Sequence, residues 1–297
     1  MEKVKENKVR DYRMDNIKAM LIILVVVGHL LELFLKSGNV KTIYKIIYSF
    51  HMPLFIFISG YFARFNLKKI FTGIIVPYIV FQTIYILYVN YILTPVRDVK
   101  FTYAQPYWLM WYMMAMAVWS IALPLISYGG KKLQISLFII SLVVSIAVGY
   151  VHEIGMKYTL SRIFVYFPFF ILGHHFSGLM KDEEKREKLK AFYHDHKMLI
   201  SMTSAAAFGA AMGLIIGYTK KVSYVWFYEC APYTVSHEPA EVRIAHFLVA
   251  VICIIYFYLL IPNIKFNFMS KLGAKTKGVY LLHGFVILAL KDMVGLI

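Results

Sequence analysis

Long apolar runs separated by short polar segments repeat along the whole of this 297-residue chain. A helix needs about 20 mostly apolar residues to cross the hydrocarbon core of a bilayer, whereas a transmembrane β-barrel is built from short alternating segments. The pattern therefore predicts an all-α, polytopic integral membrane helix bundle of about nine to ten transmembrane helices. Nine runs can be read directly, at residues 14–35, 43–63, 70–93, 108–126, 133–150, 161–177, 198–218, 244–261 and 278–297.

Positive charge is distributed unevenly between the two sides that this topology creates. The net charge is +16, and about two thirds of the 32 Lys and Arg fall in the N-terminal tail and every second connection or adjoining helix end. An excess of Lys and Arg on the cytoplasmic side orients membrane proteins. We therefore expect a multi-pass protein with a cytoplasmic tail at 1–13 and a membrane domain at 14–297. The charge then needs no nucleic-acid partner to explain it.

The first apolar run carries ionisable residues on one helical face. At about 100° per residue, Lys18 and His29 lie within roughly 20° of each other, with Asp15 and Glu32 about 60° to either side. If Lys18 marks the membrane interface, a helix rise of about 16 Å places His29 near the midplane. An ionisable residue there is costly and indicates function. The structural alternative is a neutral imidazole bonded to Glu32 or to a neighbouring helix.

The second run adds another histidine, His51, two residues before Pro53. Proline leaves a backbone carbonyl free one turn earlier in a helix, so this stretch offers polar groups inside the membrane. Ser59 lies further along the same run. The two polar helices predict a pocket between them. The alternative is a kinked packing helix with an interfacial histidine.

Two connections and one small-residue pattern also carry predictions. Residues 181–197 are dense in both charges and predict a solvated helical connection. The connection 219–243 is rich in aromatic residues, which usually lie at a membrane interface and alternatively stack on sugar faces. Small residues at every fourth position predict a helix-packing face, at Ala205, Gly209, Gly213 and Gly217.

Several of these motifs together resemble one family. Lys18, ten intervening residues and His29 match the Arg/Lys-x10-His motif of the acyltransferase 3 family of membrane-bound acyltransferases. The flanking RMDNIKAMLIILVVVGHLLE resembles its fucose 4-O-acetylase-like branch. Further segments follow in the family's order: FHMPLFIFISGYF, GIIVPYIVF, YWLMWY, SRIFVYFPFFILG and LGAKTKGVYLLHG. The resemblance extends along nearly the whole chain after the tail.

This resemblance implies an O-acetyltransferase, with residues 14–297 as its acyltransferase domain. Such enzymes move an acyl group, commonly acetyl from acetyl-CoA, to a hydroxyl of a cell-surface carbohydrate or its lipid-linked precursor. It also implies a bacterial plasma membrane. His29 takes the place of the family's essential histidine, and Lys18 that of its Arg/Lys. The pocket candidates in the other motifs are Trp111, Arg162 and His283.

The chemistry of these side chains is compatible with acyl transfer. A neutral imidazole at His29 can accept a hydroxyl proton as a general base, and Glu32 one turn along can orient it and stabilise the imidazolium. Arg64, Lys68 and Lys69 are candidates for the phosphates of CoA, although they depart from the Arg-x-x-Arg of many family members. The sequence shows no credible metal-ligand spacing, and no metal is expected.

Several alternatives stay open at this stage. A transporter or channel would also place His and Glu inside the membrane, as a proton or substrate path. Within the enzyme hypothesis, the acceptor either attacks the thioester directly or meets an acyl-histidine intermediate. The acceptor, the acyl chain length and the oligomeric state are not determined by the sequence, and an oligomer is compatible with it.

Overall fold

The computed structural model describes residues 11–93, 98–155, 157–219 and 221–295. These ranges form helices and connections without any strand, so the predicted all-α class is confirmed. Of the predicted tail at 1–13, residues 1–10 lie outside the described ranges, and the first helix begins at Tyr12. The helices are α1 Tyr12–Leu31, α2 Gly38–Phe62, α3 Leu67–Ile70, α4 Val76–Tyr91, α5 Trp111–Ser127, α6 Lys131–Ala147, α7 Leu160–Lys181, α8 Glu183–Asp195, α9 Lys197–Thr219, α10 Tyr233–Ser236, α11 Ala240–Leu260, α12 Asn267–Ala274 and α13 Thr276–Met293.

Short helical turns of other types join or extend several of these helices. A π-helical segment connects α3 to α4, and 3₁₀ turns flank α1, α5, α6, α7 and the start of the α9–α11 connection. Their bounds are η1 Glu32–Phe34, η2 Phe71–Ile75, η3 Trp108–Met110, η4 Val148–Tyr150, η5 Lys157–Thr159 and η6 Tyr224–Tyr228.

Eight helical segments in the described ranges are long and apolar enough to cross a membrane. They correspond to the first eight predicted runs. The ninth run, 278–297, also forms a helix, α13, but this helix carries charged residues at both ends. Lys277, Lys291 and Asp292 lower its apolar character, so length and composition do not make it a ninth span.

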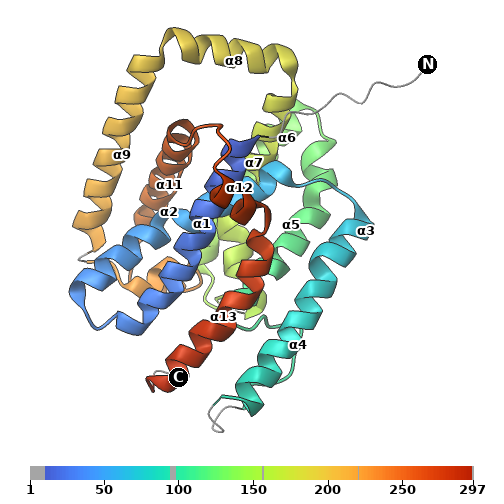
Figure 1. The fold of residues 1–297 in the computed structure, drawn as a ribbon, viewed down its shortest axis with the longest axis vertical. Helices are drawn as coiled ribbons and strands as arrows, with labels where there is room; N and C mark the ends of the chain where they lie inside the picture. The colour runs from blue at the N-terminus through green and yellow to red at the C-terminus, as the bar shows by residue number, and fades with distance from the viewer. Residues whose placement is uncertain (1–10, 94–97, 156, 220, 296–297) are drawn as a thin grey trace.

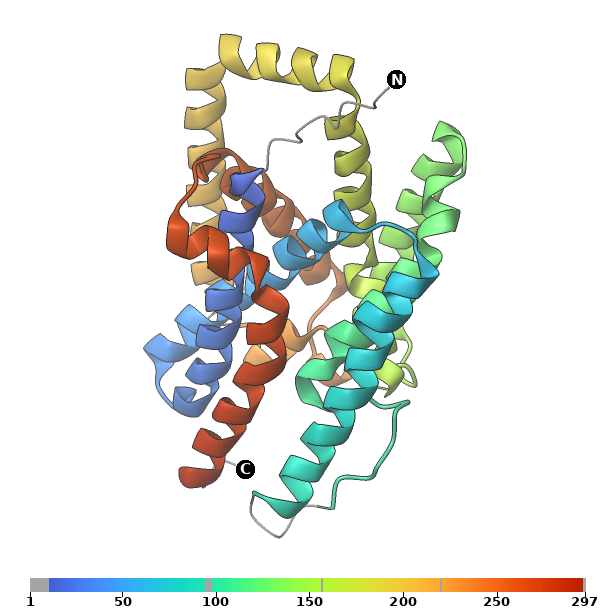
Figure 2. The ribbon, with the colours of Figure 1, turned by 45° about the vertical axis from the view of Figure 1, so that its right-hand side comes forward.

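The two ends of the bundle contain different helix termini (Figure 1). We call the end at which α1 begins the Tyr12 end, and the opposite end the His29 end. The Tyr12 end also holds α8 and α12, whereas α13 ends at the His29 end (Figures 1 and 2). The exposed α8 lies across the Tyr12 end between α7 and α9, which confirms the predicted solvated helix at 181–197.

The α9 helix packs with the face opposite to the predicted one. Gly209, Gly213 and Gly217 are exposed, and a Cβ atom at each of them would meet no neighbouring atom. The buried residues are instead Ala211 and Ile215. Two residues correspond to about 200° of rotation around a helix, so these two side chains point away from the small-residue stripe. The prediction of a packing face at that stripe is wrong within this chain.

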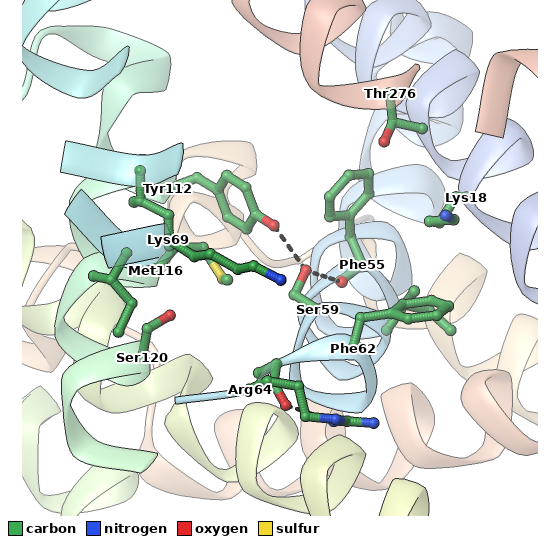
Figure 3. A pocket seen from close by; sticks show the side chains of 14 residues that line it. Lys18, Phe55, Ser59, Phe62, Arg64, Lys69, Tyr112, Met116, Ser120 and Thr276 are labelled. Carbon is green, nitrogen blue, oxygen red and sulfur yellow. Dashed lines mark hydrogen bonds between the residues drawn. The ribbon is translucent and has the colours of Figure 1, made fainter. Parts of the chain in front are cut away.

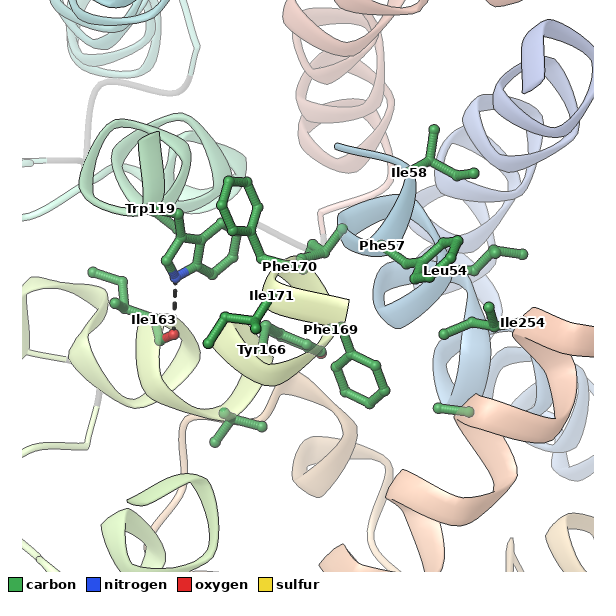
Figure 4. Close-up of a cluster of buried hydrophobic side chains, with 14 of the residues drawn as sticks. Leu54, Phe57, Ile58, Trp119, Ile163, Tyr166, Phe169, Phe170, Ile171 and Ile254 are labelled. Carbon is green, nitrogen blue, oxygen red and sulfur yellow. Dashed lines mark hydrogen bonds between the residues drawn. The ribbon is translucent and has the colours of Figure 1, made fainter. Parts of the chain in front are cut away.

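The α2–α7 contact forms the centre of the bundle (Figure 4). Phe57 of α2 and Phe169 and Phe170 of α7 belong to one buried cluster. Two glycines allow the backbones to approach closely: a Cβ atom at Gly60 would collide with the Phe170 carbonyl, and one at Gly173 with the Phe57 carbonyl. Small residues at helix crossings serve this purpose in membrane bundles, where close packing replaces the hydrophobic effect.

We expect Gly173→Ala to destabilise the protein, because its methyl group meets backbone that cannot move aside. Overpacking of this kind costs roughly 1–3 kcal/mol. Gly178→Ala is the matched control on the same helix, since nothing lies within contact distance of a Cβ atom there. Thermal unfolding of both variants in detergent measures the effect. Equal melting temperatures for the two variants would contradict the proposed α2–α7 contact.

Candidate active site

The side chains of His29 and Glu32 form a hydrogen-bonded pair at the end of α1. The α-helix ends at Leu31 and continues as the 3₁₀ turn η1, which keeps Glu32 three residues along on the same side. His29 Nδ1 lies 2.9 Å from Glu32 Oε1. Because an ionised carboxylate can only accept, a neutral imidazole donates from Nδ1 here. Its Nε2 is then left as an acceptor for another molecule.

Glu32 receives two further donors from distant helices. Tyr48 Oη of α2 donates to Glu32 Oε1 at 3.0 Å, and Lys291 Nζ of α13 lies 2.5 Å from Oε2. A buried carboxylate is stable only when such partners replace its water. Neither Tyr48 nor Lys291 was among the sequence candidates. Together they fix the carboxylate that orients His29.

Two more rings face His29. His283 of α13 has its ring centroid 5.5 Å away, and Trp108 has its centroid at 4.8 Å. His283 Nδ1 donates to the Tyr280 carbonyl at 2.8 Å. Its buried Nε2 has no hydrogen-bond partner among the described residues. A second imidazole therefore offers an acceptor nitrogen beside His29.

Trp108 contacts His29, whereas the pocket candidate Trp111 lies beside Arg162. Trp108 has a φ of 40°, in the left-handed region that costs free energy for a residue with a side chain. In this conformation the Trp108 ring also forms a cation–π contact with Lys291, whose Nζ lies 4.9 Å from the ring centroid. Both tryptophans belong to the YWLMWY motif at residues 107–112. The motif therefore already contained Trp108, three positions before the candidate Trp111.

His29 lies away from the middle of its helical span. The span runs from Tyr12 to Phe34, so His29 is about 9 Å beyond its centre. The predicted midplane position depended on Lys18 marking the interface. In the structure α1 begins six residues before Lys18, so Lys18 does not mark the start of the helix. Lys18 and His29 are instead displaced to opposite sides of the centre.

The predicted four-residue face consequently forms two separate ion pairs. Lys18 Nζ contacts Asp15 Oδ1 at 2.8 Å and lies 4.8 Å from the centroid of the Phe62 ring. This pair is about 16 Å along α1 from His29, so the four side chains do not share one catalytic centre.

Lys18 lines a cavity of about 330 Å³ near the Tyr12 end (Figure 3). We call it the Lys18 cavity. Lys18 and Lys69 approach it from opposite sides, and Arg64 lies at its edge. Ser59 Oγ, 2.7 Å from Tyr112 Oη, forms part of its inner wall. The other polar lining residues are Ser120 and Thr276.

Two of the three predicted phosphate-binding residues line this cavity, and the third does not. Arg64 and Lys69 line it, whereas the exposed Lys68 does not. Arg64 Nη2 also donates to Ser177 Oγ of α7 at 3.0 Å. A cavity with three cationic side chains and apolar walls can accept an anionic ligand that has an apolar arm.

The remaining pocket candidates lie elsewhere in the bundle. His51 is buried and donates from Nδ1 to the Ile47 carbonyl at 2.8 Å, and its ring lies 4.7 Å from Tyr48. Its ring therefore packs against Tyr48. Arg162 lies 5.0 Å from the centroid of Trp111, and its Nε donates to the Tyr228 carbonyl at 2.7 Å.

A buried charge cluster that the sequence did not reveal holds the connection between α9 and α11. Glu229 contacts Arg243 Nη2 at 3.2 Å and His246 Nδ1 at 3.1 Å. His246 Nε2 donates to the Ser49 carbonyl at 2.7 Å. Burial by itself raises the pKa of a carboxyl, but Arg243 and His246 outweigh it and hold the pKa of Glu229 below its ordinary value.

This cluster places the aromatic residues of the connection. Trp226 and Phe227 are buried against the bundle. The ring of Tyr228 meets those of Tyr44 and Tyr48 edge-on, at 6.4 and 6.1 Å. Tyr48 donates a hydrogen bond to Glu32, so the contact of Tyr228 with Tyr48 links this connection to the His29–Glu32 pair.

A polar site inside an all-α membrane bundle, with a hydrogen-bonded His–Glu pair and a separate basic cavity, fits a membrane-bound group-transfer enzyme. The sequence model of the acyltransferase 3 family, described as an acyltransferase domain, matches residues 11–297. The chain therefore belongs to this family and is a multi-pass membrane acyltransferase. Family membership decides against the transporter or channel alternative.

Two curated relatives share a short stretch of sequence with this chain. Nodulation protein NolL of Sinorhizobium fredii is 50% identical over 58 residues, covering 18% of this chain and 16% of the relative. Nodulation protein NolL of Mesorhizobium japonicum is 44% identical over 68 residues, covering 21% and 18%. The chain thus spans less than a fifth of either relative in these matches. No solved structure matches it.

We expect Glu229→Gln to destabilise the protein at pH 7, because Arg243 loses its buried counter-ion. Removing one partner of such a pair costs roughly 3–5 kcal/mol. The lowered pKa of Glu229 means that its contribution is complete above the ordinary carboxyl pKa and is lost as pH falls through the folded-state value. The difference in melting temperature between wild type and variant should therefore shrink in acid.

Glu241→Gln, at an exposed position in the first turn of α11, is the matched control. It should change the melting temperature little at any pH. A Glu229→Gln deficit that stays constant from pH 7 down to about pH 3 would show that the charge of Glu229 is not the source of the effect.

Proposed function

We propose that this membrane acyltransferase transfers an acetyl group from acetyl-CoA to a hydroxyl of a cell-surface carbohydrate or its lipid-linked precursor. His29 acts as the general base. The observation that carries this proposal is the His29–Glu32 pair, in which the bonded Nδ1 leaves Nε2 available. The carbohydrate acceptor rests on the resemblance of the first-helix segment to fucose 4-O-acetylase-like proteins.

The reaction proceeds by proton transfer and attack at the thioester. His29 Nε2 accepts the proton of the acceptor hydroxyl while the hydroxyl oxygen bonds to the carbonyl carbon. The carbon–sulfur bond breaks, and the leaving CoA sulfur takes up the proton from the His29 imidazolium, which restores the neutral base. Glu32 holds the imidazole and stabilises it when it is protonated. His283 Nε2 is free to accept a hydrogen bond from a different hydroxyl of the carbohydrate.

The donor enters through the Lys18 cavity. Its volume of about 330 Å³ is near the lower limit for small-molecule pockets, so it suits the pantetheine arm of CoA better than the whole molecule. The phosphates then lie at the rim, near Arg64 and Lys69. Tyr112 lines this cavity and packs against Tyr280, whose ring centroid lies 6.1 Å from that of His283. The proposal requires the pantetheine arm to pass these packed rings to reach His29.

The distribution of basic residues supports a cytoplasmic location for the Tyr12 end. This end contains the connections around 64–69, 131–132, 181–197 and 262–277, which hold many of the Lys and Arg. The positive-inside rule places such connections in the cytoplasm, where acetyl-CoA is made. His29 then lies nearer the outer face, where a surface carbohydrate is accessible.

We expect His29→Ala to lower acetyl transfer about a hundredfold or more, because a general base is lost. Acetyl-CoA consumption by purified protein in lipid vesicles measures the rate. NMR of the surface glycan from a complemented deletion strain identifies the product. His152→Ala, at an exposed histidine, is the control and should leave both readouts unchanged. Retention of more than a tenth of wild-type transfer by a folded His29→Ala variant would exclude His29 as the base.

We expect Lys69→Gln to weaken acetyl-CoA binding, because this side chain points into the Lys18 cavity and engages phosphate as a point charge. Lys68→Gln removes the same charge from the adjacent position outside the cavity. Acetyl-CoA affinity measured at two salt concentrations separates the two, and the Lys69→Gln affinity should depend less on salt. Equal affinities for both variants would remove Lys69 from the donor site.

A further inference from the structure

A second cavity at the Tyr12 end takes no part in the proposed reaction. It has a volume of about 590 Å³ and lies between the end of α5, the start of α6 and the end of α7. We call it the His174 cavity. It shares no lining residue with the Lys18 cavity. The proposed binding of acetyl-CoA at the Lys18 cavity therefore does not involve the His174 cavity, which has no ligand in the proposed reaction.

The polar side of the His174 cavity carries positive and hydrogen-bonding groups. Lys131, Lys185, His174 and His175 line it, and none of its lining residues is Asp or Glu. Lys185 pairs with Asp182 outside the lining. Lys131 forms no ion pair within the described part of the chain.

Two histidine nitrogens at this cavity have unmet hydrogen-bonding capacity. His174 Nε2 lies 2.9 Å from Ser127 Oγ, but its buried Nδ1 has no partner among the described residues. The buried Nε2 of His175 also has none in those ranges. Buried polar atoms in native structures are nearly always paired, so these two nitrogens still require a partner, which a water or a ligand would supply.

The other side of the cavity is apolar. Ile135 and Phe138 of α6 and Leu172 of α7 form part of its wall. Ile135 is exposed, as is Ile139 one turn further along, so the apolar wall continues onto the membrane-facing surface of α6. A soluble anion would leave this apolar wall without a contact, and an uncharged hydrocarbon chain would leave Lys131 without a counter-ion. A ligand with both an anionic group and an apolar chain contacts both sides of the cavity.

We propose that the His174 cavity binds an anionic glycerophospholipid. The lipid phosphate lies near Lys131, its acyl chains follow the apolar face of α6, and His174 and His175 line the polar side of the site. Basic pockets between transmembrane helices at a membrane surface are suited to anionic head groups. This assignment depends on the chain spanning a membrane and is independent of the proposed acyl transfer.

Lipid binding to the full-length protein in detergent tests this proposal. The probes are phosphatidylglycerol and phosphatidylcholine, and the readouts are native mass spectrometry and the rise in melting temperature. Phosphatidylglycerol should bind wild type more tightly. Lys131→Gln should lower its affinity about fivefold, as expected for one basic residue near a membrane surface. Lys132→Gln, at the neighbouring exposed lysine outside the cavity, should match wild type.

A cavity-filling variant tests the same site without changing its charge. Gly178 lines the cavity and has open space around its Cβ position, so Gly178→Leu should exclude the lipid from a folded protein. If that variant fails to fold, the two lysine variants still decide the outcome.

Three results would overturn the proposal. Equal losses in Lys131→Gln and Lys132→Gln would indicate general attraction to the membrane surface. Equal binding of phosphatidylcholine would indicate an apolar groove without head-group recognition. An equal rise in melting temperature with glycerol phosphate would indicate a site for a soluble phosphate instead of a lipid.

Discussion

The buried carboxylate of Glu32 is the interaction on which the candidate site depends. A charge inside a helix bundle is costly unless donors surround it. Its partners come from three parts of the chain: His29 one turn earlier, Tyr48 on α2 and Lys291, which is 259 residues away in sequence. Glu32 therefore requires α13 to pack beside α1. The same packing brings His283 of α13 to face His29. The site therefore forms only when α13 is packed against α1.

The features that were predictable from the sequence are local ones. Apolar run length determines which segments span a bilayer, and eight of the nine predicted runs form such spans. The contact between His29 and Glu32 follows from a separation of three residues on a helix, which places side chains next to each other. The charged helix α8 was predictable for the same reason, because its ion pairs join residues three or four apart.

The features that escaped prediction depend on packing between distant segments. Nothing near Lys291 or Glu229 in the sequence indicates a partner, because both meet theirs only after the helices assemble. A shared helical face likewise gives no measure of distance along the axis, and about 16 Å of helix separates Lys18 from His29. The small residues of α9 had two possible faces to pack, and neighbouring helices selected the other one.

The separation of the Lys18 cavity from His29 along α1 determines where each product leaves. Under the proposed function, spent CoA departs from the Tyr12 end while the acetylated carbohydrate departs from the His29 end. The nucleotide carrier then never leaves the cell, and only the small acetyl group changes sides of the membrane. The degree of acetylation of the surface carbohydrate would then depend on the concentration of acetyl-CoA in the cytoplasm. It would therefore change with the nutritional state of the cell.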